Sequence, residues 1–538
     1  MPICGARFAP VSPRWCRRAA YLNRYVGVAK YPLRVAKTDA ETSQSSMPDD
    51  AARQRFLRRL ERLARQLKGG QWASGQDLWD WQVALLDLQR EIQGGITSLK
   101  GTGRNADQQA LLDWLKDIRW HARRLGDAFA WVVLGLEMRV LHSLAENDRV
   151  PVSVEDHGSR GMTMIAAHLA DEGWGFPVLH DVTDCLRIGD ITFVDVTTKP
   201  RTFRTVEVKT RVTGERPTSD GKTEYTYQVQ AILHFSPGEV PSVDDSSKPE
   251  ELTLKATQGP PQIARGPSRL DRQMRRMSTA IAKQNAIPGE VTDIPGQDPL
   301  LTTDIKIRTS AHWKELRRVI RKARTYGYAS EPIDGALIYL ALYRKEGLTA
   351  ESINEGLTAE SVKGIPFAEE IERSGIFDRA TDRFPNSLVV HGVPPNEDRG
   401  GIRYFLPHFL YSIPHRAISD LLHHRLAIIV LSNPGKLVDA IEAVGLKVSN
   451  RSGVPDLEPG SIVATHRFED ASGGTWHVEL HNLNWHIFEL IYEFKSIQHL
   501  VAVALSTCDV AQKGFAELHG IELLNGPPND SEMPSRPK

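Results

Sequence analysis

The sequence has few cysteines, no long apolar run and no excess of either charge. Its four cysteines, in a chain of 538 residues, show no paired short spacing. Such spacing excludes a disulfide framework and a zinc knuckle, which both need cysteines at short, paired intervals. The longest apolar runs, such as 128–136, are shorter than the roughly 20 residues of a membrane-spanning helix. We therefore expect a protein of a reducing, cytoplasmic compartment with no membrane segment.

Charge is balanced over the whole chain but not along it. Lys and Arg together number 67, as do Asp and Glu. A neutral chain has no overall attraction to nucleic acid, so any basic surface must be local. Residues 1–46 hold eight Lys or Arg but only two acids, Asp39 and Glu41. This leader lacks the apolar segment of a secretory signal. It is interpreted as a disordered tail, as sequence upstream of a true start at Met47, or as a transit peptide.

The hydrophobic pattern changes period along the chain. Residues 48–146 show helical spacing, as in Phe56, Leu60, Leu63 and Leu67, with breaks expected at paired glycines such as Gly94-Gly95. A short helix is then predicted over 162–172, followed by strands over 176–182, 186–197 and 202–210. Towards the C-terminus the pattern predicts helix over 312–325, 418–423 and 436–444, and strand over 335–343, 388–391, 426–431, 462–466 and 501–506.

These patterns predict a multidomain α/β protein. The expected segments are a basic, disordered leader (1–47), a helical region (48–127), a core of strands and helices (128–285), a linker with a helical segment (286–345), an α/β C-terminal domain (346–524) and a disordered tail (525–538).

One constellation carries recognisable chemistry. Asp190 follows a glycine at the start of a predicted strand, and Glu207 and Lys209 lie two residues apart on the next strand. Side chains alternate along a strand, so Glu207 and Lys209 should share a face while Val206 and Val208 enter the core. A hairpin would bring Asp190 beside Glu207. Two carboxylates can share a hard divalent cation, and a nearby lysine can neutralise charge on a phosphoryl group.

The order helix, strand, Asp190, hairpin, Glu207-x-Lys209, helix resembles the PD-(D/E)XK nuclease superfamily over residues 128–285, with Gly189 in place of the proline. The resemblance implies a restriction-endonuclease-like mixed sheet flanked by helices. It also implies hydrolysis of nucleic-acid phosphodiester bonds with Mg²⁺ or Mn²⁺, held by Asp190 and Glu207. DNA is the expected substrate, in defence against foreign DNA or in DNA repair.

The superfamily often adds a carboxylate from a helix ahead of the strands. Glu137 interrupts an apolar helical stripe, which is costly for an unpaired charge, and is preferred as a catalytic residue over Glu172. Beyond the core, Arg269, Arg272 and Arg276 fall on one side of a predicted helix at 268–284. They are the expected phosphate contacts.

A second Glu-x-Lys, Glu493-Phe494-Lys495, shows that this short motif is not specific by itself. It falls where Ile487, Leu490 and Ile491 predict a helix, so strand context favours Glu207 and Lys209. The C-terminal histidines complete no zinc motif and are interpreted as structural. Two alternatives remain: an inactive nuclease-fold module that binds nucleic acid, and a protein–protein scaffold or regulator.

Overall fold

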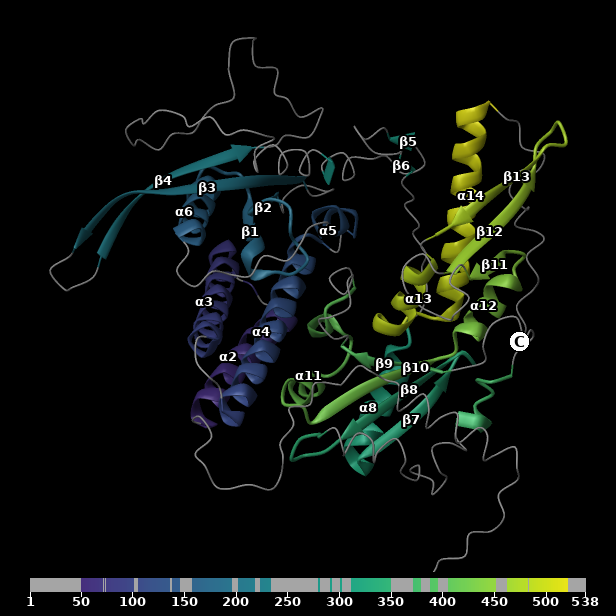
Figure 1. Ribbon diagram of the computed structural model, residues 1–538, viewed down its shortest axis with the longest axis horizontal. Coiled ribbons are helices and arrows are strands. Elements are labelled where there is room, and N and C mark those ends of the chain that lie inside the picture. Colours follow the sequence, from purple (N-terminus) through teal and green to yellow (C-terminus); the bar gives the residue numbers. More distant parts are fainter. Residues whose placement is uncertain are drawn as a thin grey trace, which may run out of the picture. The chain divides into compact units, whose positions relative to one another are not determined.

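The computed structural model divides the chain into two compact units (Figure 1). The N-terminal unit falls within 41–304 and 397–411, and the C-terminal unit falls within 305–396 and 412–538, together with 1–40. The structure describes residues 50–70, 72, 74–100, 105–135, 138–145, 157–195, 202–217, 223–233, 279–280, 291–292, 300–301, 311–349, 371–378, 388–394, 405–450, 462–481 and 483–520.

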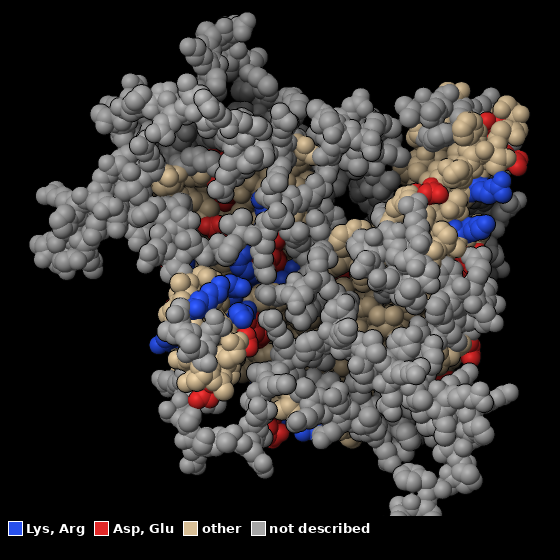
Figure 2. All heavy atoms as spheres, in the orientation of Figure 1, with Lys and Arg blue, Asp and Glu red and all other residues tan. Residues whose placement is uncertain are grey.

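Three long helices form one layer of the N-terminal unit: α2 (Asp50–Gly69), α3 (Gly75–Lys100) and α4 (Ala106–Val133). They lie against one another, as Figure 1 shows. In the same orientation, Figure 2 shows Lys and Arg side chains gathered over this part of the molecule. The predicted helical region is confirmed, but Gly94-Gly95 does not break it. A Cβ on Gly95 would lie 3.2 Å from a methyl of Leu115, so this glycine lets α3 and α4 approach closely.

The second layer of this unit is a four-stranded sheet in the order β1-β2-β3-β4. Two shorter helices and a two-stranded sheet accompany it. The bounds are α5 (Met138–Ala145), α6 (His157–Asp171), β1 (Phe176–Leu179), η1 (His180–Val182), β2 (Ile191–Asp195), β3 (Thr202–Pro217), β4 (Thr223–Leu233), β5 (Val291–Thr292), β6 (Leu300–Leu301) and η3 (His408–Leu410).

The sheet is antiparallel throughout the strands that the structure describes. The mixed sheet implied by the nuclease resemblance therefore has no parallel pair in this part of the chain. Gln82 of α3 closes the outer edge of β1: its side chain donates to Pro177 O at 3.0 Å and accepts the Leu179 N–H at 2.8 Å. A buried amide thus replaces the neighbouring strand that these backbone groups would otherwise need.

The C-terminal unit is built on a second antiparallel sheet, in the order β7-β8-β10-β9. Helix α8 covers one face, and a cluster that includes Ile338, Leu340 and Ile429 fills the other. The bounds are α8 (Trp313–Tyr326), β7 (Tyr328–Ile333), β8 (Leu337–Tyr343), β9 (Val389–Val393), α11 (His415–Leu422) and β10 (Leu426–Ser432). Strand β8 lies before the expected domain boundary at 345/346 and β10 lies after it, yet the two strands pair in one sheet.

A third antiparallel sheet, β11-β12-β13, packs with helices in the same unit. The bounds are α12 (Pro434–Glu442), β11 (Lys447–Asn450), β12 (Ile462–Glu469), β13 (Thr475–Leu480), α13 (Leu483–Tyr492) and α14 (Ile497–His519). The strand predicted over 501–506 was wrong, because these residues belong to α14. In the described part of the chain, no helix combines the length and the apolar character needed to cross a bilayer.

Gly126 of α4 tests how tightly the two layers of the N-terminal unit meet. A Cβ at this position would lie 1.8 Å from the backbone oxygen of Val182. Helix propensity alone would favour Gly126→Ala by about 1 kcal/mol. Overpacking against backbone costs about 1–3 kcal/mol or more, and no side chain can rotate away to relieve it. We expect a net loss of about 2 kcal/mol or more, seen as a lower urea midpoint.

Gly75→Ala is the matched control, because a Cβ on this exposed glycine at the start of α3 meets nothing within 4 Å. Its urea midpoint should equal or exceed that of the wild type. A Gly126→Ala protein as stable as Gly75→Ala would show that α4 does not approach η1 this closely.

Candidate functional site

The β2–β3 hairpin positions Asp190 at its open end. Regular pairing runs from Asp195 opposite Thr202 to Ile191 opposite Val206, and Asp190 comes directly before this ladder. Gly189 has φ 78°, and a Cβ there would lie 2.5 Å from a methyl of Thr205, so the position requires glycine. The bend turns the Asp190 N–H towards Val206 O, at 2.9 Å.

The carboxylate of half-buried Asp190 reaches β3 next to Glu207. Its Oδ2 accepts the Val208 N–H at 2.6 Å, and Val208 is the residue between Glu207 and Lys209. Glu207 is 2% exposed. Val206 and Val208 are buried, as the alternation predicts. Lys209 lies on β3 opposite Gln230, and its side chain is outside the described part of the structure. The hairpin thus places Asp190 at the backbone between Glu207 and Lys209.

A chain of hydrogen bonds supports the start of β2. His180 Nδ1 donates to the carbonyl of Gly189 at 3.0 Å, so Nε2, 2.8 Å from the Thr192 hydroxyl, is left to accept. The Thr192 and Thr205 hydroxyls lie 3.1 Å apart. Burial lowers the pKa of His180 to about 3, which keeps the ring neutral and the tautomer fixed. Thr192 is two residues from Asp190 and Thr205 is two residues from Glu207, so both threonines lie on the same face of the sheet as these carboxylates. This alternation can be read from the sequence.

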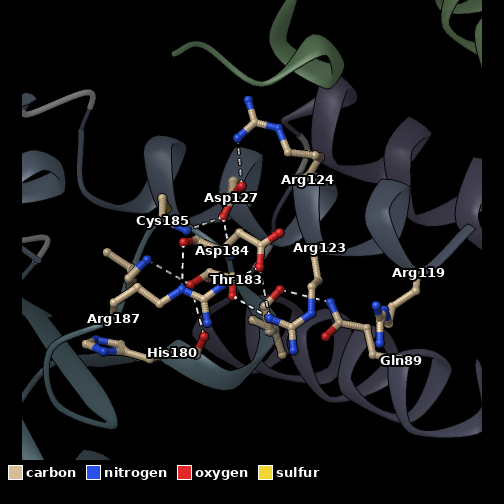
Figure 3. A network of polar contacts seen from close by, with 12 residues as sticks. Gln89, Arg119, Arg123, Arg124, Asp127, His180, Thr183, Asp184, Cys185 and Arg187 are labelled. Carbon is tan, nitrogen blue, oxygen red and sulfur yellow. Dashed lines mark hydrogen bonds and ion pairs between the residues drawn. The ribbon is translucent and has the colours of Figure 1, made fainter. Parts of the chain in front are cut away.

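A buried carboxylate, Asp127 of α4, holds the segment that leads to Asp190 (Figure 3). Its Oδ1 accepts the N–H groups of Asp184 at 2.6 Å and Cys185 at 2.7 Å, and its Oδ2 pairs with Arg124 at 2.8 Å. Asp127 is 0% exposed. Burial raises its pKa above the ordinary value, although Arg124 acts in the opposite direction. We name this group, Arg124 and Asp127 with the two amides, the Asp127 clamp.

A second set of ion pairs extends the clamp towards the hairpin. Asp184 accepts from Arg123 at 2.9 Å and also pairs with Arg187, as Figure 3 shows. The N–H groups of Arg187 and Ile188 both donate to Leu144 O, at 2.6 and 3.1 Å. Helices α4 and α5 therefore fix the backbone up to the residue before Gly189.

The other predicted site residues are not brought together by the described structure. Glu137, Arg269, Arg272 and Arg276 lie outside the described residues. Glu172 is exposed, directly after α6. Sequence reasoning missed Asp127, because it sought a glutamate close to the strands. A signal was present: Asp127 stands in an apolar stretch, as Glu137 does.

The competing Glu493-Phe494-Lys495 is not helical, contrary to the prediction. Helix α13 ends at Tyr492, and Phe494 adopts φ 56°. Lys495 forms an isolated bridge with Ala311, and its ammonium lies 4.0 Å from Glu493. The motif occupies a turn after a helix and has no hairpin partner comparable to Asp190.

The donor set at the hairpin suits a hard divalent cation in chemical type. Asp190 and Glu207 supply carboxylate oxygens, the ligands that Mg²⁺ and Mn²⁺ prefer. In the part of the chain that can be described, no group of three or more His, Cys, Asp or Glu side chains is arranged to hold a metal ion. The two carboxylates would therefore need water or phosphate oxygens to complete the coordination.

Two C-terminal histidines contact a half-buried glutamate. Glu489 Oε2 lies 2.9 Å from His486 Nδ1 and 3.1 Å from His499 Nε2, which joins α13 to α14. Burial opposes ionisation of Glu489, but the hydrogen bonds from the two histidines outweigh it and bring its pKa to about 2. The cluster is thus a link between two helices.

Removing the Asp127 carboxylate should strongly destabilise the N-terminal unit. Asp127→Ala leaves Arg124 as a buried charge without its partner, together with two backbone N–H groups. Breaking a buried pair in this way costs about 3–5 kcal/mol. The measurement is urea unfolding followed by tryptophan fluorescence.

Asp113→Ala is the matched control, because Asp113 and Lys116 form another i,i+3 pair on α4, at 3.0 Å but partly exposed. An exposed pair contributes about 0–1 kcal/mol. Equal effects of the two substitutions would contradict the structural importance of the clamp.

Glu489 should stabilise the C-terminal unit in a pH-dependent way. Its folded pKa of about 2 lies below the ordinary 4.5, so the ionised form favours the folded state. This stability is complete above pH 4.5 and is lost as the pH falls from 4.5 towards 2. The thermal midpoints of wild type and Glu489→Gln should therefore converge in that window. Glu479→Gln, which removes an exposed carboxylate 3.1 Å from His481, should differ little from wild type at any pH. A gap for Glu489→Gln that stays constant from pH 6 to pH 3 would refute the assignment.

Comparison with known proteins adds no relative to this picture. No protein-family model, no curated protein and no solved structure matches the chain. The functional assignment therefore rests on the residues of this chain.

Proposed function

We propose that the N-terminal unit is a divalent-cation-dependent nuclease that hydrolyses phosphodiester bonds, with DNA as its substrate. The observation that carries the proposal is the contact between the Asp190 carboxylate and the backbone of Val208, between Glu207 and Lys209. This contact brings Asp190 to the backbone next to Glu207 and Lys209, although 17 and 19 positions separate it from them in the chain.

The order of elements also supports the proposal. Helix α6, strand β1, Asp190, strand β2 and the Glu207-x-Lys209 strand β3 follow one another as in the PD-(D/E)XK resemblance. Helix α6 packs on β3, where a Cβ on Gly161 would meet the Thr210 hydroxyl at 2.0 Å. Thr210 alternates with Glu207 and Lys209 along β3, so α6 covers the opposite face. Glu207 and Lys209 then belong to the face that α6 does not cover, on which Glu207 is 2% exposed.

Each residue has a distinct part in the proposed reaction. Asp190 and Glu207 would hold the cation, which when bound lowers the pKa of a water molecule and neutralises phosphate charge. Lys209 would stabilise the negative charge that develops on the phosphoryl oxygens. Neutral His180 and the two threonines keep the start of β2 in place. Asp190 also holds the Val208 N–H, so its geometry is set before substrate arrives.

The test is a cleavage assay with the full-length protein on duplex DNA, single-stranded DNA and RNA, in Mg²⁺, Mn²⁺ or EDTA. Wild type should cut DNA only with metal. Lys209→Ala should lower the rate by about 10²–10³-fold, the usual effect of losing one group that stabilises developing charge. Asp190→Asn should abolish cleavage while keeping an oxygen for the Val208 N–H, so loss of activity would not reflect loss of the fold.

Lys495→Ala is the matched control, because it removes the lysine of the other Glu-x-Lys motif. It should cleave at the wild-type rate. Equal cleavage by wild type and Lys209→Ala would overturn the proposal. Metal-independent binding with no cleavage of any of these substrates would favour an inactive nucleic-acid-binding module.

A further inference from the structure

Helix α8 of the C-terminal unit is strongly basic and has an unusual division of charge. It carries one acidic residue, Glu315, and six basic ones: Lys314, Arg317, Arg318, Arg321, Lys322 and Arg324. The zero net charge of the whole chain conceals this local excess. We name the exposed residues Lys314, Arg317, Arg321 and Lys322 the α8 basic face.

Helical spacing separates this face from the core. Successive residues of an α-helix turn by about 100°. Leu316, Val319, Ile320 and Ala323 are buried, 0–2% exposed, and pack towards β7 and β8. The α8 basic face points the opposite way, and Thr325 continues it as an exposed polar residue. Glu315 lies on the flank, between the two faces, near His312 at 3.7 Å.

Within the described part of the unit, no ion pair involves the cations of this face. Arg318 pairs with Glu331, and Arg324 pairs with buried Asp420 at 3.0 Å. Among the residues that the structure describes, no carboxylate lies within ion-pair distance of Lys314, Arg317, Arg321 or Lys322. Four like charges along one helical face repel one another, which is unfavourable for folding. A polyanion bound there would relieve that repulsion.

The burial of the apolar side decides between two kinds of polyanionic partner. An amphipathic basic helix binds an acidic membrane by inserting its apolar face among the lipids. In α8 that face is occupied, because Leu316, Val319, Ile320 and Ala323 are buried against β7 and β8. Apart from Thr325 and Tyr326 at its C-terminal end, α8 presents charged side chains to solvent, which suits a phosphate backbone.

We propose that the α8 basic face binds the phosphate backbone of nucleic acid. Lys314, Arg317 and Arg321 repeat at three and four residues and span roughly 10 Å at 1.5 Å per residue. This length matches about three nucleotides at 3.4 Å per step along one strand. Such contacts provide affinity and position without reading sequence. The face would give the C-terminal unit a substrate-holding role that extends the proposed nuclease activity.

The test measures binding of the full-length protein to a fluorescein-labelled DNA duplex by anisotropy, in EDTA so that no cleavage occurs. One variant combines Lys314→Gln, Arg317→Gln and Arg321→Gln, since glutamine keeps helix propensity similar. We expect the Kd to rise about tenfold or more at moderate salt, and the salt slope to fall by about one per lost phosphate contact. Circular dichroism should match the wild type, and the thermal midpoint should equal or exceed it because less charge repulsion remains.

The matched control removes three exposed arginines from α2 in the other unit: Arg58→Gln, Arg62→Gln and Arg65→Gln. Its Kd should change less than about twofold. Equal weakening by both triple variants would show a nonspecific charge effect and overturn the proposal, as would unchanged binding by the α8 variant. Binding to phosphatidylserine vesicles that depends on α8, without duplex binding, would also overturn it.

Binding and cleavage fail separately in this design. Binding is measured in EDTA, where no cleavage occurs, and cleavage is measured with Mg²⁺ or Mn²⁺, so each proposal has its own readout. If no cleavage is found but binding depends on α8, only the proposed nuclease activity is lost.

Discussion

The buried carboxylate of Asp127 is the constraint on which the N-terminal unit depends. Removing a carboxylate from water is costly, and here one arginine and two backbone N–H groups offset part of that cost. In a low-dielectric interior these bonds are strong, and a missing partner is correspondingly expensive. Helix α4 and the segment at Asp184 are therefore expected to unfold cooperatively. The close approach of Gly126 to Val182 keeps the same contact free of side chains that would hold it apart.

Backbone and ion-pair contacts hold the segment between the Asp127 clamp and the hairpin in place. Asp184 is held by Arg123 and Arg187, and the next residues donate to Leu144 O. Gly189 then makes a turn that only glycine tolerates, and Asp190 emerges with its carboxylate bound to the Val208 N–H. A functional group is most useful when neighbouring contacts hold it before a ligand arrives. Asp190 meets that condition because both its backbone and its side chain are tied.

Regular patterns were predictable from sequence, and exceptions arose where packing overrode them. Strand alternation correctly buried Val206 and Val208, because one face of β3 lies under a helix. The run Val501–Ser506 contains β-branched residues and was expected as a strand, yet α14 buries Leu500, Val503 and Ala504 on one side of a helix. The strand propensity of a few residues contributes less free energy than burying the apolar face of a long helix. Glu493 was wrongly expected to be helical, because Phe494 has a positive φ that few non-glycine residues adopt.

The candidate site was predictable in part for the same reason. Asp190, Glu207 and Lys209 follow from a hairpin and a period of two, which are local. The Asp127 clamp joins residues 57 positions apart and depends on how α4 meets η1, which no local pattern contains. His180 acquires its role only because burial makes it neutral and Gly189 offers a carbonyl.

The balance of charge is informative only once burial is known. Among the described residues, the buried charged side chains are two arginines, Arg123 and Arg124, and six acids, Asp127, Asp184, Glu207, Asp420, Asp470 and Glu493. Folding thus withdraws more acidic than basic groups from the surface. A chain with no net charge can then present basic faces to solvent, such as that of α8. The buried acids Asp127 and Asp184 organise backbone N–H groups and arginines. Neutral composition therefore gives no reason to exclude a polyanion as that partner.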